Sequence, residues 1–420
     1  MKFLEILNED DIIELQSSIN ESIYSELETN ALQYSDKDFY EILTKYILDL
    51  FYTEWEEAEL CNKDDYYELG EFVYDFIIDF FETYKEFPHR HYSEYKDEDV
   101  CKESLIEKIK YLKDLPQPKQ KSIEWYEYRY NLLTASSIWK VFGSESMINS
   151  IIYEKCKPLD PNISKKYMGS SVQWGNVFEP VSIMIYEKKY KTKVEDFGCI
   201  QHPEIKCIGA SPDGINVDEN SEKFGRMLEV KNIYNRDIDG NPKEEYWIQM
   251  QIQLETCDLE ICDFLETRFK EYELEDDYFE DDSREWKGII LAYYNVSQNE
   301  VIYKYSELNI ESIDYINWKN ELSEELEKKG FTNTKSYFYY LDELSCVVVK
   351  RNKLWFNSAK NKIIETWDII LKERVEGYEH RSTKKKIENF KVFVSHEDND
   401  SHLIHNLTID NKIEIVKMDS

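Results

Sequence analysis

Two carboxylates and one ammonium group in this sequence are spaced so that they could act together on a phosphate ester. Asp213 lies in a Ser-Pro-Asp-Gly segment, and Glu229 and Lys231 follow in the otherwise apolar run 227–231. Side chains alternate along a strand, so Glu229 and Lys231 would leave one face together. Carboxylate oxygens suit Mg²⁺, with Mn²⁺ as a substitute, and the lysine could neutralise charge on a phosphate. The pattern predicts metal-dependent hydrolysis of phosphodiester bonds.

The alternative interpretation of this pattern is an ion pair on the protein surface. The spacing between Asp213 and the Glu229-x-Lys231 pair also arises by chance in other proteins, and exposed Glu–Lys pairs are common. The setting favours a site, because solvated charges are unexpected within an apolar strand and because Asp213 lies between a proline and a glycine.

Turn residues and apolar runs predict how these residues are positioned. The segments 207–210 and 215–217 are expected to be strands on either side of the Pro-Asp-Gly turn, and 227–231 a third strand. Apolar residues at helical spacing follow at 244–257, and later strands are expected over 288–305. We therefore expect an α/β fold in which a mixed sheet is flanked by helices.

Charge is distributed unevenly along the 420 residues. The formal net charge is −34, and residues 1–100 hold 28 of the 86 acidic side chains but only 7 of the 52 lysines and arginines. Such a charge argues against a protein that coats nucleic acid by bulk electrostatics, because phosphate neutralisation needs lysine and arginine. A locally basic groove stays compatible, since eight basic and five acidic residues lie in 116–175.

Prolines and helical periodicity predict the domain organisation. The first hundred residues show apolar positions at helical spacing, and Pro116 and Pro118 then interrupt any helix. We expect an acidic helical region over 1–115, a catalytic domain over 116–376 and a polar C-terminal tail over 377–420.

Cysteine usage and hydropathy exclude other classes of protein. The eight cysteines form no CxxC pair and lie at no zinc-ligand spacing with histidines. No run of about 18 apolar residues occurs, and the first ten residues contain three acids, so neither a membrane span nor a secretory signal is expected. We expect a soluble intracellular protein with reduced thiols and no membrane partner.

Five sequence blocks occur in the order that is typical of one group of nucleases. They lie at 122–137, 175–180, 209–214, 228–231 and 246–251. The first block contains Trp-Tyr-Glu-Tyr-Arg-Tyr-Asn-Leu-Leu-Thr-Ala-Ser, which is similar to the motif Trp-x3-Arg-x4-Thr-Ala-Ser. Together the blocks resemble the lambda-exonuclease or YqaJ-type viral recombinase family. The resemblance implies that residues 116–376 form a nuclease domain with a restriction-endonuclease-like core of the PD-(D/E)xK type.

The resemblance also implies a metal-binding set. Asp213, Glu229 and the carbonyl of Val230 would bind Mg²⁺, and Glu179 would assist a second metal ion. Lys231 would be the catalytic lysine. The alternative for Glu179 is an acid that complements the dipole of a helix in its first turn.

Three further residues would contact the substrate on this resemblance. Arg129 and Ser136 would hold a terminal 5′-phosphate, and Gln249 would orient the water or the phosphate. A surface position is the alternative for Arg129, and a helix N-cap for Ser136. Gln251 and Gln253 lie on the same expected helix. Residues that are two positions apart point to different sides of a helix, so the three glutamines cannot all face the active site, and Gln249 is our candidate.

The implied activity is that of a 5′-to-3′ exonuclease on linear double-stranded DNA, used in viral recombination, replication or repair. A single-strand annealing protein and a homo-oligomer are the expected partners, in the host cytoplasm or nucleus or in the virion. An endonuclease, an RNA-degrading relative and a catalytically idle DNA-end-binding protein are the alternatives. The acidic N-terminal region has no counterpart in the family, and we hypothesise that it binds a partner or repels DNA.

Overall fold

The computed structural model describes residues 7–57, 59, 61–84, 87, 89–90, 101–118, 120, 122–159 and 171–382. The chain divides into two units, residues 1–382 and 383–420, and the second unit lies outside the described residues. The polar tail expected over 377–420 is therefore described only as far as residue 382, and it includes the short helix η4 (Glu379–Arg381). The domain boundaries at 115 and 376 stay predictions.

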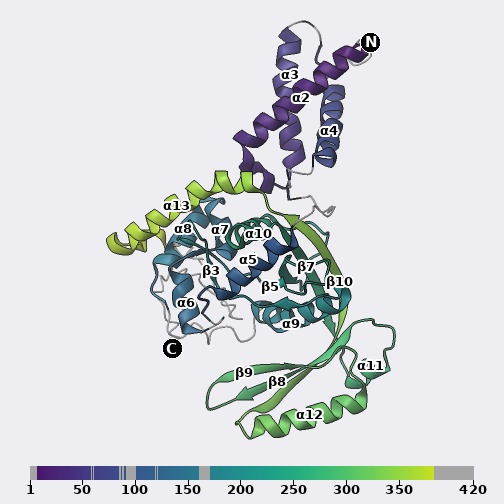
Figure 1. Cartoon of the computed structure of the whole chain (residues 1–420), viewed down its shortest axis with the longest axis vertical. Coiled ribbons are helices and arrows are strands. Elements are labelled where there is room, and N and C mark those ends of the chain that lie inside the picture. Colours follow the sequence, from purple (N-terminus) through teal and green to yellow (C-terminus); the bar gives the residue numbers. More distant parts are fainter. Residues whose placement is uncertain are drawn as a thin grey trace, which may run out of the picture. The chain divides into compact units, whose positions relative to one another are not determined.

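A seven-stranded mixed sheet carries Glu229, Val230 and Lys231 on one of its strands (Figure 1). Its strand order is β2-β5-β6-β7-β10-β8-β9, and every pair is antiparallel except β6 with β7. The α/β fold with a mixed sheet is thus confirmed, as is the strand expected over 227–231. The strands are β2 (Val194–Glu195), β5 (Gly214–Asn216), β6 (Met227–Asn232), β7 (Ile261–Glu271), β8 (Lys287–Asn295), β9 (Glu300–Tyr305) and β10 (Thr332–Lys350).

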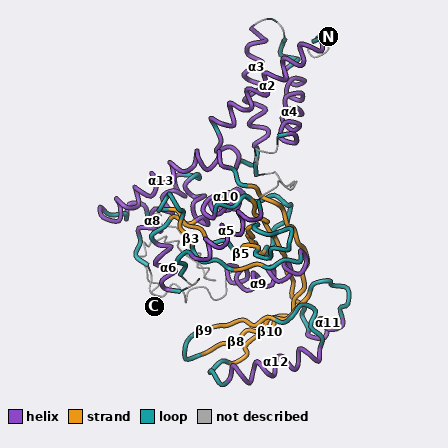
Figure 2. The backbone as a smooth tube through the Cα atoms, viewed as in Figure 1, coloured by secondary structure: helices purple, strands orange, loops and turns teal. Residues whose placement is uncertain are grey.

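Strand β10 joins two parts of this sheet. Its first half pairs with β8 and its second half with β7, and the register shifts between Leu341 and Glu343. In Figure 2 the outer part, with β8 and β9, extends away from the helices around β5 and α10. Helices α11 (Glu275–Glu280) and α12 (Ser312–Glu327) accompany the outer part, where Leu291 and Tyr293 contribute to a separate hydrophobic cluster.

A second, three-stranded sheet brings together parts of the chain that are far apart in sequence. Its order is β1-β4-β3, with β1 (Leu133–Thr134), β3 (Ile200–Gln201) and β4 (Ile208–Ala210). β1 runs parallel to β4, with Thr134 opposite Gly209. The strand expected over 207–210 is therefore present, and its pairing places the first sequence block beside the segment that leads to Asp213.

Helices pack on both sheets, and the buried residues of α10 (Glu244–Cys257) and of α9 (Ser171–Tyr190) belong to different hydrophobic clusters. α9 packs on β6, and α10 on β4 and β10. Ten of the 14 residues of α10 are buried, so its three glutamines need hydrogen-bond partners inside the protein. The remaining helices around the site are α5 (Lys102–Asp114), α6 (Ile123–Tyr130), α7 (Ala135–Ile138), η2 (Trp139–Val141), α8 (Glu145–Cys156) and α13 (Lys353–Glu376).

The N-terminal region is helical, as its periodicity predicts. It contains α2 (Glu9–Thr29), η1 (Ala31–Ser35), α3 (Phe39–Glu57) and α4 (Tyr66–Thr83). α2 begins with a capping box, in which the Asn8 side chain accepts the Asp11 amide at 3.0 Å. Helix α5 also lies in this expected region, yet Lys108 Nζ donates to the carbonyl of Asp258 at the end of α10, at 2.8 Å.

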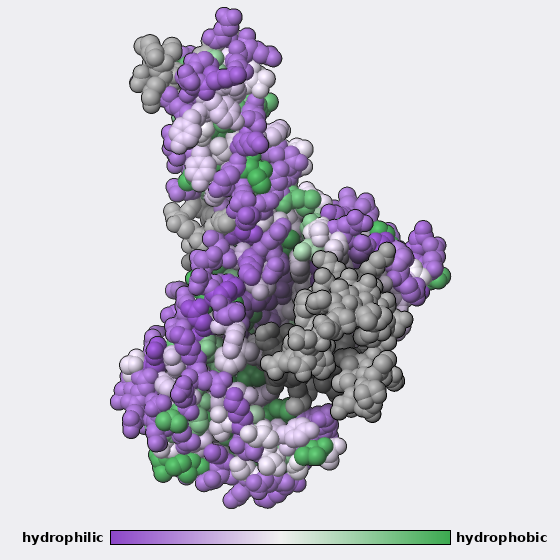
Figure 3. All heavy atoms as spheres, turned by 180° about the vertical axis from the view of Figure 1, so that it is seen from behind, coloured by the Kyte–Doolittle hydropathy of each residue, from purple (hydrophilic) through white to green (hydrophobic). Residues whose placement is uncertain are grey.

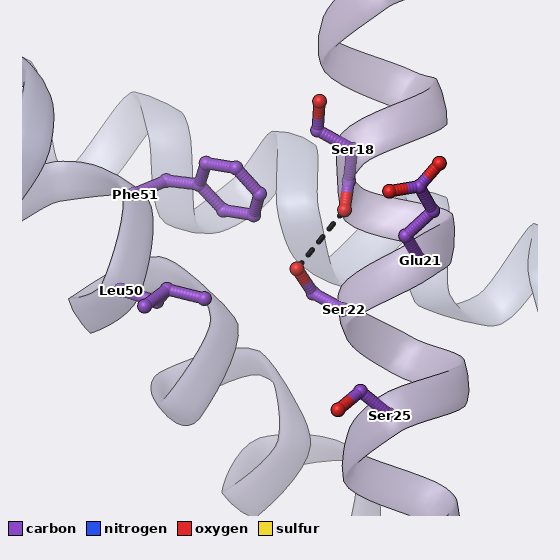
Figure 4. Close-up of a pocket in the computed structure, with 6 residues that line it drawn as sticks. All are labelled: Ser18, Glu21, Ser22, Ser25, Leu50 and Phe51. Atoms are coloured by element: carbon purple, nitrogen blue, oxygen red, sulfur yellow. Dashed lines mark hydrogen bonds between the residues drawn. The ribbon is translucent and has the colours of Figure 1, made fainter.

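A shallow hollow of about 400 Å³ lies between α2 and α3 (Figure 4). Ser22 Oγ donates to the carbonyl of Ser18 within it, and Glu21 is its single carboxylate. It offers no group of carboxylates for phosphate-ester chemistry. The lining residues are Ser18, Glu21, Ser22, Ser25, Leu50 and Phe51.

The face of the molecule in Figure 3 is mainly polar among the described residues. Hydrophilic side chains cover most of the face in Figure 3, and hydrophobic ones are scattered across it. Among the described residues no helix has the length and hydropathy to cross a membrane.

A buried ion network holds the connection from β5 to β6. Asp263 on β7 is fully buried, and it accepts from Tyr186 Oη at 2.6 Å, Lys223 Nζ at 2.8 Å and Arg226 Nη1 at 3.4 Å. Lys223 and Arg226 precede β6, so this aspartate fixes the loop through which the chain enters the strand that carries Glu229 and Lys231. Because two cations share one carboxylate, its removal leaves both without this partner.

We predict that Asp263→Asn destabilises the protein by about 3 kcal/mol, the usual cost of breaking a buried ion pair. Equilibrium urea unfolding measures this change. Glu325→Gln is the matched control, because the Lys329–Glu325 pair is about 60% exposed on both sides and its loss should cost less than about 1 kcal/mol. Equal effects of the two substitutions would contradict the structural role of Asp263.

Candidate active site

Strand β6 presents Glu229 and Lys231 on the face that the alternation predicts. Glu229 is 1% exposed and the Lys231 side chain 21% exposed. Leu228 and Val230 point to the other side, where they pack with Tyr186 of α9. The surface ion pair that we considered as the alternative is thus wrong, because Glu229 is inside the protein.

Asp213 lies directly before β5 and next to β6. Its Oδ2 accepts the backbone amide of Val230 at 2.7 Å. Burial, together with the neighbouring carboxylates of Glu229 and Glu179, raises the pKa of Asp213 well above its usual range. The three predicted carboxylates therefore interact electrostatically, and a bound cation would relieve their repulsion.

The buried carboxylate of Glu229 is held by three donors. Lys231 Nζ forms an ion pair with Oε1, which also accepts from Gln249 Nε2 at 2.7 Å. Gln253 Nε2 donates to Oε2 at 2.8 Å. Burial disfavours the charge on Lys231, but Glu229 and Asp213 outweigh it and raise the lysine pKa above its usual range.

Gln249 is placed in the site as predicted, but Gln253 is a residue that our sequence interpretation missed. Gln251 points elsewhere, since its Nε2 donates to the carbonyl of Lys350 at 2.9 Å and its Oε1 accepts the amide of Asn352 at 2.7 Å. Residues four apart share a helix face, so the spacing of Gln249 and Gln253 was the signal that could have identified the second glutamine.

Glu179 lies in the interior of α9, as the ninth residue of a helix that starts at Ser171. The alternative of a first-turn acid is therefore wrong. Asn232, which ends β6, fixes this part of α9, because its Nδ2 donates to the carbonyl of Gly175 at 2.9 Å and its Oδ1 accepts from Ser182 Oγ at 2.8 Å. These contacts hold this part of α9 beside β6, the strand that carries Glu229.

Arg129 is the centre of a polar cluster next to the carboxylates. Its Nη1 donates to Ser211 Oγ at 3.2 Å, and its Nη2 donates to Ser136 Oγ at 3.2 Å and to Thr134 Oγ1 at 3.4 Å. The guanidinium carbon lies 4.3 Å from the centre of the Trp125 ring. A guanidinium with two hydroxyl groups is suited to bind a phosphate, and Ser211 is only two residues from Asp213.

The structure places both residues predicted for the 5′-phosphate in this cluster. Ser136 is exposed and lies inside α7, whose N-cap is Thr134, so the alternative of a helix N-cap is wrong for Ser136. Arg129 is half-buried rather than a plain surface residue. Ser211 was missed, although its position beside Asp213 in the Ser-Pro-Asp-Gly segment could have indicated it.

Two cations fix the end of the helix that carries Arg129. Lys155 Nζ donates to the carbonyl of Arg129 at 2.8 Å, and Arg374 Nη2 to the carbonyl of Tyr130 at 2.7 Å. Burial, with Arg129 and Arg374 nearby, lowers the pKa of Lys155 to about 8. Cations at a helix C-terminus satisfy its unpaired carbonyls, so they hold the Arg129 guanidinium in place.

The oxygen atoms that could hold a cation come from Asp213, Glu229 and the backbone of Val230. Among the residues that the structure describes, no three Asp, Glu, His or Cys side chains gather as a metal-binding group. Two carboxylates and a carbonyl nevertheless fit Mg²⁺, which keeps water and substrate oxygens as its other ligands. The raised pKa of Asp213 fits too, since burial and the neighbouring carboxylates disfavour its charge and a cation would favour it.

We predict that Asp213→Asn stabilises the metal-free protein. Asparagine keeps an acceptor for the Val230 amide but removes the charge. Because the pKa of Asp213 is raised on folding, the ionised carboxylate destabilises the fold as the pH rises above about 4, where an unfolded aspartate ionises. With a chelator at pH 7 we expect a gain on the order of 1–3 kcal/mol, which shrinks towards pH 4.

Urea unfolding at several pH values measures this gain. Asp282→Asn is the control, because Asp282 is exposed and its substitution should give no such pH-dependent difference. A variant that is no more stable than the wild type at pH 7 would show that the carboxylates do not repel one another.

Residues 124–260 match the sequence model of the YqaJ-like viral recombinase domain. An uncharacterized protein of Acanthamoeba polyphaga mimivirus is 28% identical over 308 residues, which are 62% of this chain and 54% of that protein. The chain thus spans about half the length of this relative.

Solved structures of two exonucleases show a looser similarity. The alkaline exonuclease LHK-Exo of Laribacter hongkongensis has a TM-score of 0.36 and 17% identity, with 60% of this chain and 94% of that chain covered. A phage-related exonuclease from Haemophilus somnus 129PT has a TM-score of 0.30 and 14% identity, with 60% and 96% covered. The family assignment therefore depends on the sequence match. Residues 124–260, which include every candidate site residue, are thus similar to the YqaJ-like viral recombinase domain.

Proposed function

We propose that this chain is a Mg²⁺-dependent nuclease that removes nucleotides from the 5′ end of linear double-stranded DNA, in the 5′-to-3′ direction. The observation that supports this best is that a cluster suited to bind phosphate lies next to the carboxylate group. Arg129, Ser136 and Ser211 form a cluster suited to a terminal phosphate, and Ser211 is two residues from Asp213 of the carboxylate group. A phosphate pocket beside hydrolytic residues favours action at an end.

The residues that would hold the metal ion are Asp213, Glu229 and the carbonyl of Val230, and Glu179 would assist a second ion. When bound, Mg²⁺ or Mn²⁺ polarises the phosphoryl oxygen and lowers the pKa of bound water. Hydrogen bonds from Gln249 and Gln253 fix the direction of the Glu229 oxygens. The chain thus presents oriented carboxylates, which do not need to reorganise during the reaction.

Lys231 and Gln249 would act on the phosphate that is cleaved. The Lys231 ammonium keeps its charge, because Glu229 and Asp213 raise its pKa, and it lies 3.4 Å from Gln249 Oε1. A fixed cation there would neutralise charge that develops on the phosphate. Gln249, next to this ammonium, would orient the attacking water or a phosphate oxygen.

Arg129 would select the end of the DNA. Its planar guanidinium, flanked by the Ser136 and Ser211 hydroxyls, offers charge-assisted hydrogen bonds to a terminal phosphate. An internal phosphodiester carries less charge and is followed by more DNA on both sides, so it would fit this cluster less well. The double-stranded DNA end is therefore the proposed substrate, and its use in viral recombination, replication or repair follows from the family.

A single-strand annealing protein, a homo-oligomer and a location inside the host cell or the virion stay predictions from the resemblance. The acidic N-terminal helices likewise have only the hypothesis of partner binding or DNA repulsion. A truncation that starts near Leu115 and leaves nuclease rate, DNA affinity and partners unchanged would remove both ideas.

We predict that wild-type protein digests linear duplex DNA with Mg²⁺, prefers a 5′-phosphate to a 5′-hydroxyl, and leaves covalently closed circles intact. Lys231→Ala should lower the rate about 100-fold or more, because a fixed charge next to the reacting phosphate is lost. Arg129→Ala should reduce the 5′-phosphate preference about 10- to 100-fold, the usual worth of charge-assisted hydrogen bonds. Gel analysis of the three substrates measures both effects.

Arg284→Ala is the matched control, because this arginine also stacks on an aromatic ring, at 4.2 Å from the Tyr340 centre, but in the outer part of the sheet. It should leave activity and end preference unchanged. Cleavage of closed circles would favour an endonuclease, and cleavage of RNA would favour an RNA-degrading relative. No cleavage of any DNA or RNA by the wild type would favour an idle end-binding protein.

A further inference from the structure

The amide of Gln253 links the two halves of the candidate active site. Its Nε2 lies 2.8 Å from Glu229 Oε2 and 3.3 Å from the backbone carbonyl of Ser211. The Ser211 hydroxyl in turn accepts from Arg129. Hydrogen bonds therefore connect the phosphate cluster to the carboxylate of Glu229. The connection runs from Arg129 to the hydroxyl of Ser211, and from the carbonyl of the same serine through Gln253 to Glu229.

Gln253 cannot touch the substrate itself. Its side chain is fully buried, whereas Gln249, one helical turn earlier, is 9% exposed and lies next to Lys231. The two glutamines share a face of α10 and each donates to a different oxygen of Glu229. Gln249 is thus on the accessible side of the carboxylate and Gln253 is beneath it.

Packing alone does not explain a glutamine at this position. Within the described part of the chain, Gln253 Oε1 is buried and has no hydrogen-bond partner. A buried polar atom without a partner is destabilising, and an apolar side chain of similar volume would avoid that cost in a position that only fills space. The contribution of Gln253 must therefore come from its amide nitrogen, which is the atom that contacts both Glu229 and Ser211.

We propose that Gln253 is a positioning residue that couples the phosphate cluster to the metal-binding carboxylates and so sets which phosphodiester bond is cut. This inference depends on the proposed nuclease function. The amide fixes one oxygen of Glu229 and the carbonyl of Ser211 relative to each other, and the same segment, 211–213, carries both the phosphate-binding hydroxyl and Asp213. A fixed separation selects the first bond after the terminal phosphate and gives mononucleotides.

The test replaces Gln253 by methionine, which keeps the volume and removes the donor. The matched control is Gln251→Met, because Gln251 is on the same helix and equally buried but bonds to Lys350 and Asn352. Four quantities are measured: the Mg²⁺ concentration that gives half-maximal digestion, the length of the released products, the preference for a 5′-phosphate, and the rise in unfolding temperature when Mg²⁺ is added. The last is independent of cleavage.

For Gln253→Met we expect about a tenfold or larger increase in the Mg²⁺ concentration required, since a charge-assisted hydrogen bond to Glu229 is lost. Short oligonucleotides should appear beside mononucleotides, the 5′-phosphate preference should fall, and the Mg²⁺-induced rise in unfolding temperature should become smaller. Gln251→Met should keep wild-type values of all four. A purely structural role would lower stability in both variants without changing product length or end preference.

Gln253→Asn provides a second variant in case the methionine protein does not fold. It keeps the amide but withdraws it by one methylene, so the same changes should occur to a smaller degree. If the wild type cleaves DNA and both Gln253 variants keep its products, end preference and Mg²⁺ requirement, the inference is wrong and the proposed function stands. If the wild type cleaves nothing, the proposed function is wrong, and an unchanged Mg²⁺-induced shift in Gln253→Met would overturn the inference as well.

Discussion

The burial of one carboxylate, that of Glu229, determines much of the architecture around it. A carboxylate that is 1% exposed requires donors for both oxygens, because an unpaired buried charge costs several kcal/mol. Those donors are Lys231, two residues along the same strand, and two amides of α10. α10 must therefore lie inside the protein, and this explains two of the three glutamines on this largely buried helix, since Gln251 bonds to Lys350 and Asn352 instead.

The second constraint is the pairing of two short strands. β1 and β4 share only two register positions, yet this parallel contact brings the helix with Arg129 to the segment that leads to Asp213. Close packing continues at Gly214, where a Cβ atom would lie 2.1 Å from the Val194 Cγ1 on the neighbouring strand. A larger residue there would displace β2 or the turn that carries Asp213, so the glycine is needed for the close approach.

Local charges differ from the average charge of the chain. The net charge is −34, but Arg129, Lys155 and Arg374 lie together at the end of α6, where carbonyl groups and stacked rings stabilise them. Much of the acidic excess is in residues 1–100, whose described part includes the helices α2, α3 and α4. The phosphate binding that we propose for this site is therefore compatible with an overall charge that repels nucleic acid, because interactions beyond about 10 Å are screened by salt.

From the sequence we could predict the residue types and the local elements of this site. Alternation along 227–231 predicted that Glu229 and Lys231 share a face, the Pro-Asp-Gly turn predicted the position of Asp213, and five ordered blocks indicated the family. The face of α10 that meets β6 was visible only in the folded protein. There Gln253, rather than Gln251, bonds to Glu229 together with Gln249, and Ser211 accepts a hydrogen bond from Arg129. These contacts link residues between 20 and 82 positions apart. Local periodicity contains no information on such partners, since they depend on how sheets and helices pack.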